Sequence, residues 1–237
     1  MSTYVYAITA ADHPVRLEGL RGVGEDGTPP RAVRSGELTA VVGDAPDGLR
    51  AKRRDVAAHQ AVLERLMTDG AVLPMRFGLV GPDDEQVAAA LEENSENYRR
   101  RLTELDGCLE FSLKVSRDED DLLREILRDS TEIRELNEAT RDNPGAHGDR
   151  VRLGELISRE VERRREQEAR EITGRLAPAA LKTAAGQPLQ DTLVNVSFLV
   201  GRDGAAAFSE AVHQEAERHS EAYTIRLNGP LPPYSFV

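Results

Sequence analysis

The chain has little of several residue types, and each scarcity excludes a class of protein. Tryptophan is absent and Phe and Tyr number only five each among 237 residues, so a large aromatic ligand pocket is not expected. A single cysteine, Cys108, excludes an internal disulfide framework and fits a reducing, cytoplasmic environment. No run of about 18 uncharged apolar residues is present, so we expect no transmembrane helix and no membrane role. The opening residues are strand-like, which predicts no signal peptide.

Positive charge is also scarce relative to negative charge. The sequence has 31 Lys and Arg residues against 42 Asp and Glu residues, a formal net charge of −11. This balance argues against binding to nucleic acid or to an anionic membrane surface. With 39% hydrophobic residues, the chain can form one large domain or two small ones, each with its own core.

No arrangement of residues supports catalysis or a metal site. Gly22–Gly27 has the glycine spacing of a dinucleotide-binding loop, but Pro29 and Pro30 stand where a helix would have to begin. His213 and His219 are six residues apart and lie on different helix faces, so they cannot share a metal ion. His59 lies on an apolar helix stripe and is interpreted as a hydrogen-bonded core residue. We expect no enzymatic activity and no metal, nucleotide or organic cofactor.

The first half of the chain predicts an α+β domain that ends near Gly107. Residues 4–8 form an apolar, β-rich run, and the turn Arg34–Glu37 between two further runs indicates a hairpin. Helical periodicity then predicts two helices on either side of a short strand. The expected elements are a strand at 4–8, a hairpin over 32–42, a helix ending at Gly70, a strand at 71–77 and a helix from 81–84 to 106.

The second half predicts another α+β domain. Apolar residues alternate with polar ones from 109 to 115, which is typical of a strand with one buried face. Residues 159–171 are nearly all charged, so we expect a projecting, largely solvated helix there. The order of elements predicts an antiparallel or mixed sheet with helices on one face and is compatible with a modified ferredoxin-like fold. The predicted domains are 1–107 and 108–237. The expected elements are a strand at 109–115, helices at 122–136 and 151–181, a strand at 193–200, a helix at 205–221 and a strand at 223–227.

The last residues of the sequence predict a docked tail. Leu231, Tyr234 and Phe236 are apolar where terminal residues are usually polar, and three prolines stiffen the segment. Two interpretations remain open: the tail packs on its own domain as a clasp, or part of it forms a partner surface. Two interpretations also remain open for Arg76, the one charged residue in an apolar segment. It pairs with a carboxylate or carbonyl inside the fold, or it contacts a partner.

Two segments together resemble the GvpL/GvpF family of gas vesicle proteins. The ending Arg226–Val237 (RLNGPLPPYSFV) resembles that family's ending, and Leu73–Gly78 (LPMRFG) matches its "LP-x-RFG" segment, with His59 on the preceding helix. The resemblance implies a cytoplasmic, vesicle-associated accessory protein in gas vesicle assembly. It would bind the small hydrophobic shell protein (GvpA type) or other accessory proteins during nucleation. Whether it remains on the vesicle as a minor component, and whether it self-associates, stays open.

Six residues in these two segments are the candidate partner-binding residues. They are Arg76, Phe77, Leu231, Pro233, Tyr234 and Phe236. The alternative function is a small-ligand-binding or enzymatic α+β protein with an unrecognised site. A deep pocket with convergent polar groups would favour that alternative, whereas shallow grooves and exposed apolar strips would favour the assembly role.

Overall fold

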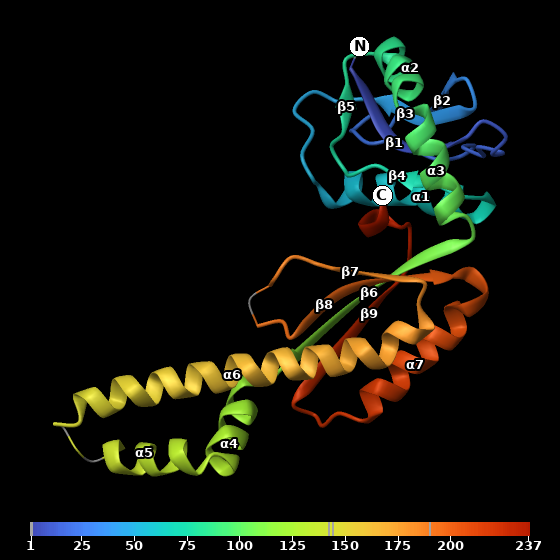
Figure 1. Ribbon diagram of the computed structural model, residues 1–237. Coiled ribbons are helices and arrows are strands. Elements are labelled where there is room, and N and C mark those ends of the chain that lie inside the picture. The colour runs from blue at the N-terminus through green and yellow to red at the C-terminus, as the bar shows by residue number, and fades with distance from the viewer. Residues whose placement is uncertain (1, 142, 144, 190) are drawn as a thin grey trace. The chain divides into compact units, whose positions relative to one another are not determined.

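The computed structural model of the chain describes residues 2–141, 143, 145–189 and 191–237. It is an α+β fold with two antiparallel sheets and helices packed on them, as the sequence predicts (Figure 1). Within the described residues, no helix is both long enough and apolar enough to cross a membrane.

The chain forms two compact units, each assembled from separate stretches of sequence. The N-terminal unit contains the residues up to Phe111 with Leu199–Ala205 and Gly229–Val237, and the C-terminal unit contains Ser112–Phe198 and Ala206–Asn228. The main difference from the expected domains 1–107 and 108–237 is the tail, which belongs to the N-terminal unit. The physical reason is apolar packing, because Tyr234 and Phe236 lie against the two hydrophobic clusters of that unit.

An antiparallel sheet with β1 at its centre organises the N-terminal unit. β3 pairs along one side of β1, from Thr3 opposite Asp44 to Ala10 opposite Leu38. The short strands β4 and β5 pair in turn with the other side of β1. β2 and β3 form the expected hairpin. The strands are β1 (Thr3–Ala10), β2 (Arg31–Ser35), β3 (Leu38–Asp44), β4 (Leu73–Pro74) and β5 (Val80–Gly81).

Helices cover both faces of this sheet, which is why β1 is buried along nearly its whole length. One cluster joins Tyr4 and Tyr6 to the apolar stripe of α1, and the other joins Val5 and Ile8 to α2 and α3. The sequence predicts one helix over the α2–α3 region, but the backbone at Asn94 breaks it in two. The helices are α1 (Arg53–Asp69), α2 (Asp84–Glu93) and α3 (Ser95–Leu105).

The second sheet has the strand order β7-β8-β6-β9. The N–H of Leu193, before β8, donates to Val115 near the end of β6, whereas the N–H of Arg202, after β8, donates to Gly107 before β6. β6 and β8 are therefore antiparallel. This strand order and the β-α-β-β-α-β succession are those of a ferredoxin-like fold with extra helices in its first crossover. The strands are β6 (Cys108–Arg117), β7 (Lys182–Ala185), β8 (Val194–Gly201) and β9 (Tyr223–Leu231).

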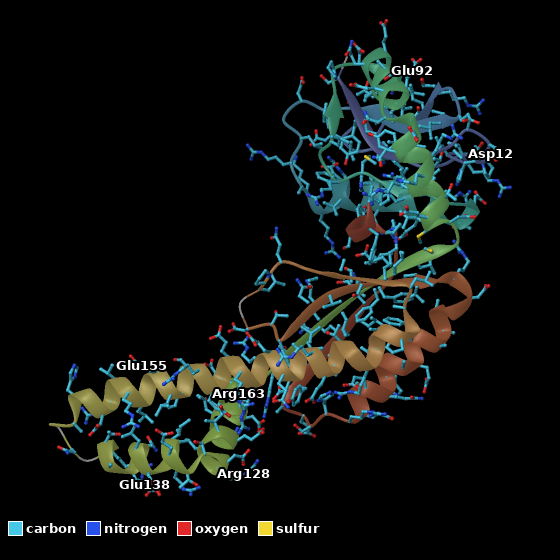
Figure 2. The ribbon with its side chains drawn as sticks, viewed as in Figure 1. Asp12, Glu92, Arg128, Glu138, Glu155 and Arg163 are labelled. Atoms are coloured by element: carbon cyan, nitrogen blue, oxygen red, sulfur yellow. The ribbon has the colours of Figure 1, made fainter. Side chains whose placement is uncertain are left out.

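The extra helices form an arm in which α5 lies beside the first part of α6 (Figure 1). A small cluster of Leu122, Ile126 and Ile133 fills the space between these helices. Figure 2 shows Glu155 and Glu138 on the outer sides of α6 and α5. The helices are α4 (Glu119–Asp129), α5 (Thr131–Arg141), α6 (His147–Leu176) and α7 (Ala205–Glu217), with short 3-10 turns at Ala177–Ala179, Arg202–Gly204 and Tyr234–Phe236.

The charged segment 159–171 of α6 is less solvated than the sequence predicts. The side chain of Arg164 is only 13% exposed and pairs with Glu125 at 2.6 Å and Glu160 at 2.8 Å. Arg117 at the end of β6 is 5% exposed and pairs with Asp121 at 3.0 Å and also with Glu125. Ion pairs therefore attach this part of α6 to α4. Basic side chains on one helix face acidic side chains on the other, so their charges are compensated inside the fold.

Candidate functional site

The segment Leu73–Gly78 is held in place by two buried side chains. Nε2 of His59 lies 3.1 Å from the carbonyl oxygen of Met75, and Nδ1 lies 2.9 Å from the Tyr4 hydroxyl. Because a carbonyl only accepts, Nε2 carries the proton and Nδ1 accepts from Tyr4. The Tyr4 hydroxyl accepts in turn from the N–H of Gly78 at 3.2 Å. His59 is thus the hydrogen-bonded core residue that the sequence predicts.

Burial keeps this polar pair uncharged. Desolvation lowers the pKa of His59 to about 4, and it raises the pKa of Tyr4 above its ordinary value. The imidazole is therefore neutral at pH 7. A neutral His59 can donate to Met75 and accept from Tyr4 at the same time, and these two hydrogen bonds hold the segment in place.

Arg76 and Phe77 point in different directions from this segment. The Phe77 ring packs edge-on to Tyr4 and His59, with centroid distances of 5.9 and 5.7 Å. Arg76 is exposed, and its guanidinium has neither an ion pair nor a hydrogen bond within the part of the chain that the structure describes. The expected internal partner of Arg76 is therefore not found there, and its contact with a binding partner stays a prediction.

The C-terminal tail is docked, as the sequence predicts, and Tyr234 and Phe236 are its anchors. Tyr234 packs against the same hydrophobic cluster as Phe77, so the two segments that carry the family resemblance are anchored on one cluster. Phe236 packs against the other cluster, and Pro233 is buried. Leu231 is half-buried. Most of the tail's apolar surface therefore serves the fold, which favours the clasp interpretation for these side chains.

Polar contacts fasten the last turn of the tail. The Glu110 side chain, in β6, is nearly buried and accepts the N–H and the hydroxyl of Ser235 at 2.8 and 2.7 Å. Arg101 of α3 donates to the carbonyl oxygen of Phe236 at 2.9 Å. Burial raises the pKa of Tyr234 to about 12, so its hydroxyl stays neutral. The tail is an integral part of the N-terminal unit.

An apolar groove of about 270 Å³ opens beside the Leu73–Gly78 segment. Val5 and Ile8 of β1 line its floor, and α2 forms one wall. The lining also contains Leu79 and Val80, two residues that are 45% and 43% exposed. Sequence reasoning missed these two residues, because no local pattern distinguishes an exposed apolar pair from a buried one. The groove residues are Val5, Ile8, Ala40, Met75, Leu79, Val80, Gly81, Pro82, Gln86, Val87, Ala90, Leu91 and Tyr98.

A second hollow, of about 490 Å³, borders the same segment. Phe77, Gly78 and Val80 line it together with the loop Ala45–Ala51. Residues 75–80 therefore contribute to the lining of both hollows, and Arg76 among them is exposed. We call these residues the ridge.

Among the described residues, no group of three His, Cys, Asp or Glu side chains is placed to hold a metal ion. His219 instead bonds to Glu215 at 2.9 Å, next to the pair between Glu215 and Arg175. The His219–Glu215–Arg175 group thus joins α6 to α7 by an ion pair. The arrangement most suited to a ligand is the groove with its ridge.

Comparison with known proteins identifies relatives across the whole chain. The family model "Gas vesicle synthesis protein GvpL/GvpF" matches residues 2–237. Gas vesicle protein F of Streptomyces sp. (strain CB03234) is 43% identical over all of both chains, and gas vesicle protein L of that strain is 30% identical over 99% of this chain and 92% of its own.

Two solved structures are similar in fold. The crystal structure of GvpF from Microcystis aeruginosa aligns with a TM-score of 0.81 at 24% identity, covering 99% of this chain and 98% of that one. GvpF from Anabaena sp. PCC7120 aligns with a TM-score of 0.85 at 24% identity, covering 99% and 97%. At this identity the two structures show the fold alone.

Proposed function

The chain belongs to the gas vesicle synthesis protein GvpL/GvpF family, and we propose that its part in gas vesicle formation is to bind the hydrophobic shell protein. The contact surface is the groove together with the ridge. Binding takes place before the shell subunit is incorporated, so the protein acts as an assembly factor.

The observation that carries this proposal is the exposed apolar surface at the groove. Leu79 and Val80 are exposed beside a hollow that is already lined by apolar side chains. Contiguous apolar surface on a soluble protein is a mark of a docking site. A shell subunit must be apolar on its gas-facing side, so before assembly it needs cover against edge-to-edge aggregation. The net charge of −11 would keep such a complex in solution.

The six predicted residues have two kinds of role in this proposal. Arg76 and Phe77 lie on the ridge, where Arg76 orients the partner and Phe77 contributes apolar contact. Pro233, Tyr234 and Phe236 hold the ridge and the groove in shape from within the fold, and Leu231 leads the tail into that position.

The chemistry of the groove favours a protein partner over a small ligand. Gln86 and Tyr98 are the polar side chains among its lining residues, and all its charged neighbours lie outside the lining. Small-ligand and active sites typically add several convergent polar groups that fix orientation. The apolar lining supports the assembly role rather than the enzymatic alternative.

Co-expression with the shell protein, in a host without the other vesicle proteins, tests this proposal. A tag on this chain should capture the shell protein in soluble form, and Leu79→Ser with Val80→Ser should lower capture about ten-fold or more. Leu181→Ser is the matched control, because Leu181 is 64% exposed but lies in the C-terminal unit.

Circular dichroism and a melting curve must show that each variant is folded. Folded Leu79→Ser/Val80→Ser protein that captures the shell protein as well as the wild type overturns the assigned surface. Capture of other accessory proteins without any capture of the shell protein overturns the proposed partner.

A further inference from the structure

We infer that the groove accepts an amphipathic helix whose apolar stripe is flanked at both ends by basic residues. This inference rests on the proposed function, because it names the part of a partner that occupies the same site. It follows from the wall that α2 presents to the groove and from the charges at the two ends of that wall.

The groove-facing side of α2 is a single helical stripe. Gln86, Ala90 and Glu93 follow one another at steps of four and three residues, so they lie on one face of α2. Asp83 is the N-cap residue just before the first turn of this helix. Gln86 and Ala90 line the groove. Asp83 and Glu93 therefore lie at the two ends of its α2 wall. With a rise of ~1.5 Å per residue, the two carboxylates are roughly 15 Å apart along the helix axis.

These two carboxylates are available to a partner. α2 has acidic residues and no basic residue along its length. Asp84 is already satisfied, because it accepts from Thr3 at 2.6 Å and pairs with Arg31 at 2.8 Å. Asp83 caps the helix by accepting from the N–H of Gln86, and neither Asp83 nor Glu93 has an ion pair within the described part of the chain. An apolar centre between two negative ends that lack an ion pair is complementary to an apolar stripe between two positive ends.

The other surfaces of the groove favour a helix over an extended strand. β5, which borders the groove, is only Val80–Gly81, too short an edge to pair with an added strand. The floor and the Leu79–Val80 part of the lining are uncharged and apolar. A helix binds such a surface through side chains at i, i+3 or i+4, and i+7, with α2 as its neighbour.

Peptide binding tests the inference with the whole chain. The probes are a dye-labelled, two-heptad leucine–lysine peptide with helical periodicity and its leucine–glutamate counterpart, measured by fluorescence anisotropy. The leucine–lysine peptide should bind and the leucine–glutamate peptide should not. Ala90→Trp fills the groove and should weaken binding about ten-fold or more. Ala89→Trp is its control, because Ala89 is exposed on the same helix but does not line the groove.

A second matched pair of variants distinguishes binding in the groove from the general attraction of a basic peptide to an acidic protein. Glu93→Lys and Glu92→Lys change the net charge equally, but Glu92, marked in Figure 2, lies off the groove stripe. Glu93→Lys should weaken binding several-fold more than Glu92→Lys at low salt, with a smaller difference at high salt. Equal binding of both peptides, equal effects of the two lysine variants, or equal effects of the two tryptophan variants overturns the inference.

Capture of the shell protein by the tryptophan variants keeps the two proposals distinguishable. Loss of both peptide binding and shell-protein capture in Ala90→Trp, with both retained in Ala89→Trp, supports both. If Ala90→Trp no longer binds the peptide but still captures the shell protein, the groove binds a basic helix of another partner. In that case the groove is not the shell-protein site, and the proposed function is overturned. If capture is lost but the two peptides bind alike, the proposed function stands and the inference is overturned.

Discussion

The carboxylate of Glu110 accepts two hydrogen bonds from Ser235, one from its backbone N–H and one from its hydroxyl. The two residues are separated by 125 positions in the sequence, yet this contact fastens the last turn of the chain to β6. Removing this nearly buried carboxylate takes the acceptor away from both donors at once.

Glu110→Ala should therefore lower the free energy of unfolding by about 1–3 kcal/mol. Ser235→Ala removes only the hydroxyl and should cost about 1 kcal/mol. Urea unfolding of both single variants and the double variant gives the coupling energy between the two residues. Strict additivity of the two effects would contradict a direct interaction.

The tail should stabilise the N-terminal unit through its aromatic anchors. Phe236→Ala should lower the free energy of unfolding by about 1.5–3 kcal/mol, because Phe236 packs against the α2–α3 cluster. Val237→Ala is the control, since Val237 is 42% exposed. Thermal unfolding should show a clear drop in Tm for the first variant and little change for the second, and equal melting curves would show that the tail does not support the fold.

Stability should decrease as the pH falls from about 6.5 to about 4, because of His59. Its pKa is about 4 in the folded protein and near 6.5 in the unfolded chain, so the unfolded chain binds the extra proton in this window. The lost stability at the lower end is about 3 kcal/mol. In His59→Gln this part of the pH dependence should vanish. Urea unfolding at several pH values measures it, and identical slopes in wild type and variant would refute the assignment.

The two neighbouring arginines of α6 should differ in their effect on stability. Arg164 is largely buried against α4 and pairs with Glu125, Asp129 and Glu160, whereas Arg163 is 56% exposed and pairs with Glu160. Arg164→Met should lower the free energy of unfolding by about 2–3 kcal/mol, because it leaves partly buried carboxylates unpaired. Arg163→Met should change it much less. Chemical denaturation compares the two, and equal effects would mean that the pairs to α4 contribute nothing.

Acid should weaken the same ion pairs at lower pH. Hydrogen bonds from Arg163 and then Arg164 lower the pKa of Glu160 to about 2. A carboxylate with a depressed pKa stabilises the fold above its ordinary pKa, and this stabilisation is lost as the pH falls toward about 2. Glu160→Gln should therefore flatten the pH dependence of unfolding below about 4.5 and leave the His59 window unchanged, which denaturation at pH 5 and pH 3 can measure.

The α+β class, most of the helices and strands, the docked tail and the resemblance to the GvpL/GvpF family can all be inferred from the residues alone. These properties depend on local patterns. The alternation around Phe111 and the stripe around His59 each report a buried face directly. The apolar tail with its three prolines likewise predicts docking from local sequence, because leaving such apolar side chains in solvent is unfavourable in free energy.

Which distant segments pack together, and which residues stay exposed between them, can be seen only in the folded chain. Leu79 and Val80 are apolar in sequence, but their exposure depends on how far α2 and α3 cover the sheet, which no local pattern states. The pairing of Arg164 with α4 and the packing of Tyr234 against the cluster around Tyr4 and Tyr6 are likewise long-range contacts. Periodicity shows whether a face is buried. The residues that bury this face come from a distant part of the chain. The groove lies where those residues leave apolar side chains exposed.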